Sequence, residues 1–145
     1  MTKKLTAIIL SLLIMLSCSA AYADASLDAQ ADKAQVSAGD TVTVTITLKG
    51  DKLAAAEGSF AYDTSLLSFE EAEGGAGDGY ISMVSLSKGG ESSLSARITF
   101  KALAEGNAEV AFSITKILNY SGKELGAAEQ KASVTILPGP EPTPT

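Results

Sequence analysis

The chain has 145 residues, a net charge of −6 at pH 7 and 46% hydrophobic residues, which suits one globular domain of ordinary size. Its acidity disfavours nucleic acid and anionic membranes as partners. It contains one cysteine and no histidine or tryptophan, which excludes an internal disulfide and the commonest metal ligand.

Residues 1–23 have the features of an export signal. Lys3 and Lys4 precede an apolar run over residues 5–16, and Ala21-Tyr22-Ala23 supplies a small-residue cleavage site. The run is shorter than the roughly 20 apolar residues that span a bilayer. We therefore expect a secreted protein, extracellular or at the cell surface, whose net charge after cleavage is −8.

Cys18 offers an alternative to simple cleavage. Leu16-Ser17-Cys18 loosely resembles the motif at which bacterial lipoproteins are cut and lipidated. We expect contact with a membrane only if Cys18 is lipidated, because cleavage after Ala23 would remove this cysteine.

The clearest strand signal spans residues 41–49. Apolar residues alternate strictly with Thr and Lys, which is typical of a half-buried β-strand. Gly-Asp pairs at 39–40 and 50–51 are typical of turns and predict the two ends of this strand. The two faces are Val42, Val44, Ile46 and Leu48 on one side, and Thr41, Thr43, Thr45, Thr47 and Lys49 on the other.

A second strand follows over residues 52–62. Its first part is rich in helix formers but is shorter than a stable isolated helix. If Phe60 and Tyr62 face inward, Gly58 and Ala56 share their face. The outer face is then small and lightly charged, with Ala55, Glu57, Ser59 and Ala61.

Residues 63–69 predict a corner between two sheets. Asp63, Thr64 and Ser65 can hydrogen-bond to their own backbone and turn the chain. Leu66 and Leu67 are adjacent, so a helical turn or a bulge would let both reach apolar surroundings.

Residues 80–87 have the alternation of a β-strand, but each of its two faces carries apolar residues, so neither face is purely polar. Two readings stay open: both faces are covered within the domain, or one face contacts a partner. In the second reading Ile81 would be an apolar anchor and Met83 an adaptable contact.

Further strand patterns occur at residues 94–102, 110–114 and 134–136, and their spacing predicts a β-sandwich. We expect a domain over residues 24–137, followed by a Pro/Thr-rich linker or tail over 138–145.

Three segments together resemble the cohesin family of bacterial cellulosomes: "VSAGDTVTVTITLKG", "LAAAEGSFAYDTSLLSFEEAEGG" and "SARITFKALAEGNAEVAFS". The resemblance implies a nine-stranded jelly-roll β-sandwich, immunoglobulin-like in general architecture, that binds a helical dockerin on one sheet face. Because the dockerin carries the calcium, no metal or other cofactor is expected in this chain. The implied partner is a dockerin-bearing protein, in the assembly of extracellular polysaccharide-degrading enzymes.

The resemblance also implies where the partner binds. The strand ending at Tyr62 belongs to the binding face, and Glu57 matches a position where cohesins often carry an acid. Ala55 departs from the pattern, because many dockerin-binding cohesins carry an Asn there. The candidate partner-binding residues are Ala55, Glu57, Ser59, Ile81 and Met83.

Other functions are weighed against this one. Glu70, Glu71, Glu73 and Asp78 surround a glycine-rich loop that cannot hold carboxylates at a fixed spacing, so no enzyme is expected. A carbohydrate-binding module that takes polysaccharide is the first alternative, although periodicity leaves only Tyr80 and Tyr120 as exposed rings. The second alternative is a structural or adhesin spacer domain.

Overall fold

The computed structural model describes residues 25–139, which form nine strands and no helix. This confirms the predicted all-β, nine-stranded sandwich. The predicted signal peptide, Cys18 and most of the tail lie outside the described residues. The strands are β1 (Ala25–Ala31), β2 (Gln35–Ser37), β3 (Thr41–Tyr62), β4 (Leu67–Glu73), β5 (Ala76–Gly77), β6 (Tyr80–Val84), β7 (Glu91–Ala102), β8 (Gly106–Asn119) and β9 (Ala128–Leu137).

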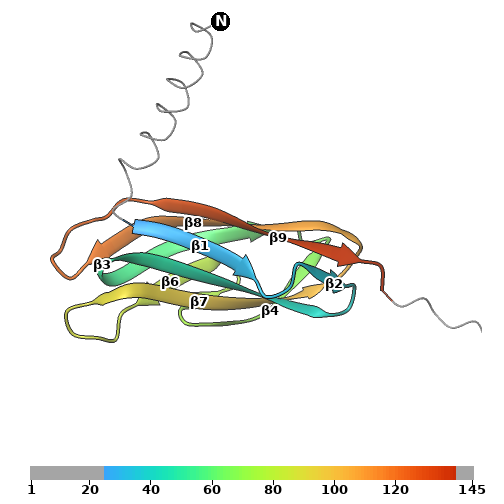
Figure 1. The fold of residues 1–145 in the computed structure, drawn as a ribbon, viewed down its shortest axis with the longest axis horizontal. Coiled ribbons are helices and arrows are strands. Elements are labelled where there is room, and N and C mark those ends of the chain that lie inside the picture. The colour runs from blue at the N-terminus through green and yellow to red at the C-terminus, as the bar shows by residue number, and fades with distance from the viewer. Residues whose placement is uncertain (1–24, 140–145) are drawn as a thin grey trace, which may run out of the picture.

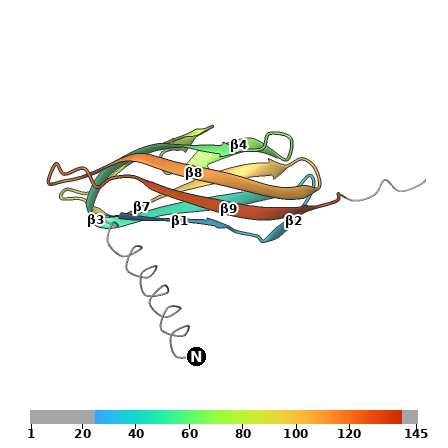
Figure 2. The same ribbon diagram turned by 90° about the horizontal axis from the view of Figure 1, so that it is seen from above.

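The strands form two layers that share β3. The first layer has the order β1-β3-β7-β4 and uses residues 41–50 of β3. The second has the order β2-β9-β8-β3-β6-β5 and uses residues 53–62. Figure 1 shows the start of β1 and the end of β9 at opposite ends of the long axis. The edge strands of the first layer, β1 and β4, lie on opposite sides of the molecule (Figure 2).

Strand β3 crosses from one layer to the other without ending. Lys52 turns the chain with a φ of 50°, and Leu53 pairs with Glu91 of the first layer and with Asn119 of the second. The Lys52 carbonyl accepts a hydrogen bond from the amide of Tyr120 at 2.9 Å. The predicted strand end at residues 50–51 is therefore wrong, because these turn residues bend the strand instead of stopping it. The predicted strand over residues 52–62 is confirmed.

The predicted corner after β3 is confirmed. The Asp63 carboxylate accepts hydrogen bonds from the amide and hydroxyl of Ser65, at 2.9 and 2.6 Å, and these bonds lower the pKa of its carboxyl. The amides of Leu66 and Leu67 both donate to the Asp63 carbonyl at 3.0 Å. This tight turn buries Leu67 and packs Leu66 against the core.

The core lies between the layers and is built by the inward side of each strand. Phe60, Tyr62, Phe100 and Phe112 form an aromatic cluster with ring centroids 4.9 to 6.0 Å apart. Burying one such side chain contributes about 1.5–3 kcal/mol to stability. The predicted inward residues of β3, β7, β8 and β9 are buried: Val42, Val44, Ile46, Leu48, Leu94, Ala96, Ile98, Phe100, Ala102, Val110, Phe112, Ile114, Val134 and Ile136.

Candidate functional site

The second half of β3 carries the centre of the candidate site. Glu57 and Ser59 are exposed on the outer side of the second layer and Ala55 is half-buried, while Ala56 and Phe60 are buried on the inner side. The predicted orientation of this segment is confirmed. The strand pairs with β6 on one side and β8 on the other, so neighbouring side chains from three strands share this surface.

Strand β6 presents the opposite side from the one predicted. Ile81 and Met83 are 2% and 1% exposed, because they lie opposite the inward residues Gly58 and Ala56 of β3. The prediction that these two residues face a partner is wrong. Residues 80–87 carry both apolar residues and serines on each side, so hydrophobicity could not decide which side is buried; the register with β3 decides it.

The residues of β6 that face outward are Tyr80, Ser82 and Val84. They lie beside Ser59, Glu57 and Ala55 respectively. Tyr80 and Val84 are 58% and 62% exposed, which makes them the large apolar side chains at this edge of the surface.

Strand β8 supplies the other side of the surface, with a bulge that sequence reasoning missed. Gly58 pairs with Ile114 and Glu57 with Lys116, so Thr115 is the extra residue. The Thr115 hydroxyl donates to the Glu57 carbonyl at 3.3 Å. The bulge places Lys116 opposite Glu57, so an acidic and a basic residue from different strands are paired in register on the outer surface.

We call this surface the small-residue face, because most of its side chains are short. Glu57, Tyr80 and Lys116 carry the long side chains near its centre, while Val84 and Leu118 flank Ala55 at one end. The face consists of Ala55, Glu57, Ser59 and Ala61 from β3, Tyr80, Ser82 and Val84 from β6, and Ala111, Ser113, Lys116 and Leu118 from β8.

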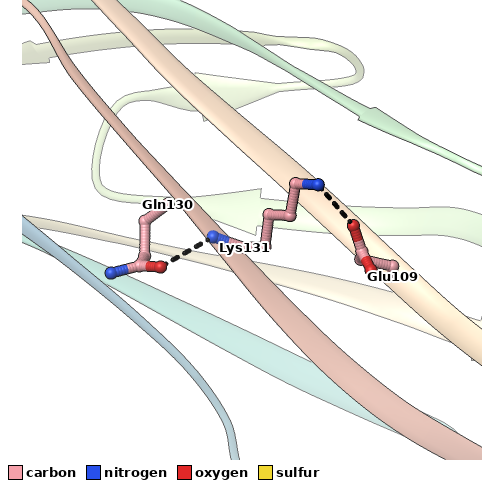
Figure 3. Close-up of polar contacts among 3 residues, drawn as sticks. All are labelled: Glu109, Gln130 and Lys131. Atoms are coloured by element: carbon pink, nitrogen blue, oxygen red, sulfur yellow. Dashed lines mark hydrogen bonds and ion pairs between the residues drawn. The ribbon is translucent and has the colours of Figure 1, made fainter.

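Strand β9 borders this face and is the second feature that sequence reasoning missed. Glu129 lies beside Ser113, and Lys131 lies beside Ala111. The Lys131 ammonium pairs with Glu109 at 3.1 Å, while its amide donates to the Gln130 side chain at 3.0 Å (Figure 3). No pattern within β9 itself indicates these neighbours, because strand pairing creates them.

A hydrogen bond steadies the turn that leads into β6. The Tyr62 hydroxyl donates to the Asp78 carboxylate at 2.9 Å. Burial, reinforced by this bond to Asp78, raises the pKa of the Tyr62 phenol above its ordinary value of 10.0. The end of β3 and the start of β6 are thereby held together at one end of the face.

The exposed tyrosines do not form a platform for a sugar. Tyr80 lies beside Ser59, whereas the backbone of Tyr120 bonds to Lys52. Those two points of β3 are seven residues apart, which corresponds to roughly 20 Å along a strand. Two rings that far apart cannot stack on one short oligosaccharide in the way that neighbouring coplanar aromatics do.

Two further findings concern the described residues. Residues 25–139 include no group of three or more Asp, Glu, His or Cys side chains placed to hold a metal ion. Within the same range, no helix is long and apolar enough to cross a membrane.

Comparison with known proteins finds similarity in structure alone. No protein-family model and no curated protein matches the chain. The sixth cohesin of scaffoldin B from Acetivibrio cellulolyticus, crystallised with a mutant Cel5 dockerin, superposes with a TM-score of 0.61 at 18% identity, covering 77% of this chain and 99% of that one. A cohesin module of a family 33 glycoside hydrolase from Clostridium perfringens gives a TM-score of 0.64 at 13% identity, over 79% and 97%.

A third structure, a type I cohesin–dockerin complex from Clostridium thermocellum, gives a TM-score of 0.60 at 13% identity, covering 77% of this chain and 99% of that one. The chain has the cohesin fold. On this cohesin-fold domain the small-residue face covers the outer side of β8, β3 and β6, and the predicted residues Ala55, Glu57 and Ser59 lie along its middle strand.

Proposed function

We propose that this cohesin-fold domain is a secreted, non-catalytic module that binds a dockerin-bearing protein through its small-residue face. Its role would be in the assembly of extracellular polysaccharide-degrading enzymes. Two of the similar structures, from Acetivibrio cellulolyticus and Clostridium thermocellum, hold a cohesin together with a dockerin. The export signal over residues 1–23 would deliver the domain to the compartment where such partners act.

The observation that carries this proposal is the shape of the face. Ser59, Ala61, Ala111 and Ser113 occupy adjacent positions of β3 and β8, so the backbone there is covered only by short side chains. A helix laid on such a surface can approach closely, and its own side chains can fill the space. The neighbouring Glu57 and Lys116 would supply polar contacts that fix its orientation.

A non-catalytic role is supported by where the acidic side chains lie. Glu71 and Glu73 are on β4 of the other layer, where they pair in register with Thr99 and Arg97. Asp78 accepts the Tyr62 hydrogen bond at a turn. On the small-residue face, Glu57 has Lys116 as its neighbour, an arrangement suited to recognition of a polar partner group.

Calorimetric titration of the mature secreted chain with purified dockerins encoded by the same genome tests the proposal. We expect one or more dockerins to bind with calcium present and this binding to be lost when EDTA removes the calcium, because the resemblance to cohesins implies that the dockerin carries calcium. The same chain is then run in affinity gels containing cellulose, xylan or mannan. Retardation by a polysaccharide without dockerin binding would establish the sugar-binding alternative, and inertness in both assays would favour a spacer domain.

A further inference from the structure

A hollow of about 270 Å³ lies where the small-residue face meets β9. Its floor is formed by the four short side chains Ser59, Ala61, Ala111 and Ser113, which occupy two adjacent rows across β3 and β8. We call it the trough. Such a space on a docking face is the size of one or two partner side chains.

The rim of the trough on the β9 side carries an acidic residue, Glu129, and a basic residue, Lys131, and only the second forms an ion pair within the described residues. Glu129 extends the row of Ser59 and Ser113, and Lys131 extends the row of Ala61 and Ala111. Lys131 forms an ion pair with Glu109 (Figure 3). By the register of β8 with β9, Glu109 lies in the next row, on the side away from Glu129. The lysine charge is therefore already compensated.

Glu129 has no such partner. Within residues 25–139 the one ion pair is that of Lys131 with Glu109, so the Glu129 carboxylate is not neutralised by a cation of the described chain. It is exposed and borders the trough next to the hydroxyl of Ser113. An apolar side chain placed beside it would desolvate a charge without compensation, which is unfavourable.

We propose that the trough receives a long cationic side chain of the partner, an arginine or a lysine, with its head group at Glu129. This inference rests on the proposed function. The aliphatic stem would lie over Ala61 and Ala111, because long basic side chains cover apolar surface with their methylene groups. The hydroxyl oxygens of Ser59 and Ser113 and the Glu129 carboxylate would accept hydrogen bonds, and a guanidinium group has only donors to offer.

This assignment makes Glu129 a residue that determines partner specificity. A dockerin with arginine or lysine at the matching position would bind, and one with an acidic residue there would be rejected by Glu129. The net charge of −6 on the chain acts in the same direction, because it attracts a partner with a basic surface.

The test uses the mature secreted chain and a purified, calcium-loaded dockerin that binds it. Glu129→Lys should weaken binding at least about tenfold, and Ser113→Leu, which fills the trough, by a similar factor. The matched control is Glu105→Lys, the same charge change on an exposed loop, which should change affinity less than about twofold. Melting temperatures of all three variants establish that they fold.

The second half of the test changes the partner. Each arginine and lysine of the dockerin is replaced by glutamate, and one of these variants should bind Glu129→Lys more tightly than it binds the wild-type chain. Dockerin binding that is indifferent to Glu129→Lys and Ser113→Leu would overturn the trough assignment and leave the proposed function standing. A chain that binds no dockerin at all would overturn both.

Discussion

The two outer faces of the sandwich are built on the same strand, which presents threonines on one face and mainly alanine and serine on the other. In the first layer, β3 presents Thr41, Thr43, Thr45 and Thr47 to the outside, opposite Lys101, Thr99, Arg97 and Ser95 of β7. In the second layer it presents Ala55, Glu57, Ser59 and Ala61. We call the first surface the hydroxyl face.

Hydroxyl groups on the hydroxyl face form hydrogen bonds with one another. Thr43 and Thr99 share a hydrogen bond of 3.0 Å between their hydroxyls, and the Ser95 hydroxyl donates to that of Thr47 at 3.4 Å. Threonine also favours strands, and cross-strand pairs of this kind stabilise a sheet. Alanine has neither property. Stability alone therefore does not explain the short side chains of the small-residue face, as expected if a partner binds there.

The largest expected effect concerns the core that both faces depend on. Leu67→Asp should abolish folding, with a loss of more than about 4 kcal/mol in the free energy of unfolding, because it places an unpaired charge at a position that is 1% exposed. Glu57→Ala on the small-residue face should leave the melting temperature unchanged. Thermal unfolding by circular dichroism measures both, and the opposite ranking would invalidate the assignment of core and surface.

The second prediction exchanges residue types between the faces. Thr45→Ala should lower the free energy of unfolding by about 0.5–1 kcal/mol, and Ala111→Thr should raise it by a few tenths, because threonine packs better on a strand. Dockerin affinity should not follow stability: Thr45→Ala should leave it unchanged, and Ala111→Thr should weaken it. Urea unfolding and calorimetric titration check the pair. A destabilising Ala111→Thr would mean that packing, not binding, requires the alanine.

A smaller effect is expected at alkaline pH. The folded chain binds the Tyr62 proton more tightly than the unfolded chain, because its pKa is raised. The resulting stability is present below pH 10 and is lost as the pH rises through the raised pKa. Tyr62→Phe should therefore be less stable than the wild type at pH 8 by about 0.5–1 kcal/mol, with a gap that narrows above pH 10.

Urea unfolding from pH 8 to pH 11 measures this gap. Tyr120→Phe is the control, since Tyr120 is an exposed ring on a loop and its hydroxyl makes no hydrogen bond within the described residues. A constant gap between wild type and Tyr62→Phe across this range would contradict the role assigned to the bond with Asp78.

Sequence reasoning predicted what depends on local pattern. Alternation along β3 predicts which side chains face outward in both halves, and the chemistry of Asp63 and Ser65 predicts the corner that buries Leu67. Sequence reasoning failed where the pairing between strands decides which side chains face inward. Both sides of residues 80–87 carry apolar residues, so the sequence pattern could not show that Ile81 and Met83 face inward. Their register with β3 shows it.

The remaining part of the site could not be read from local pattern. The bulge at Thr115 moves Lys116 next to Glu57, and the pairing of β8 with β9 puts Glu129 beside Ser113. The first joins segments far apart in the chain, and the second depends on the register between two consecutive strands. The bend at Lys52 was missed for a different reason, since the same glycine and aspartate residues that end strands also allow one to bend without ending.

If the two outer faces have different roles, one pair of substitutions on β3 should affect dockerin binding unequally. Ser59→Arg places a long side chain in the middle of the small-residue face, and Thr45→Arg places the same side chain on the hydroxyl face. Calorimetric titration with one purified, calcium-loaded dockerin should show at least about tenfold weaker binding for Ser59→Arg and less than about twofold for Thr45→Arg. Equal weakening by both, or the larger loss with Thr45→Arg, would contradict this difference in roles.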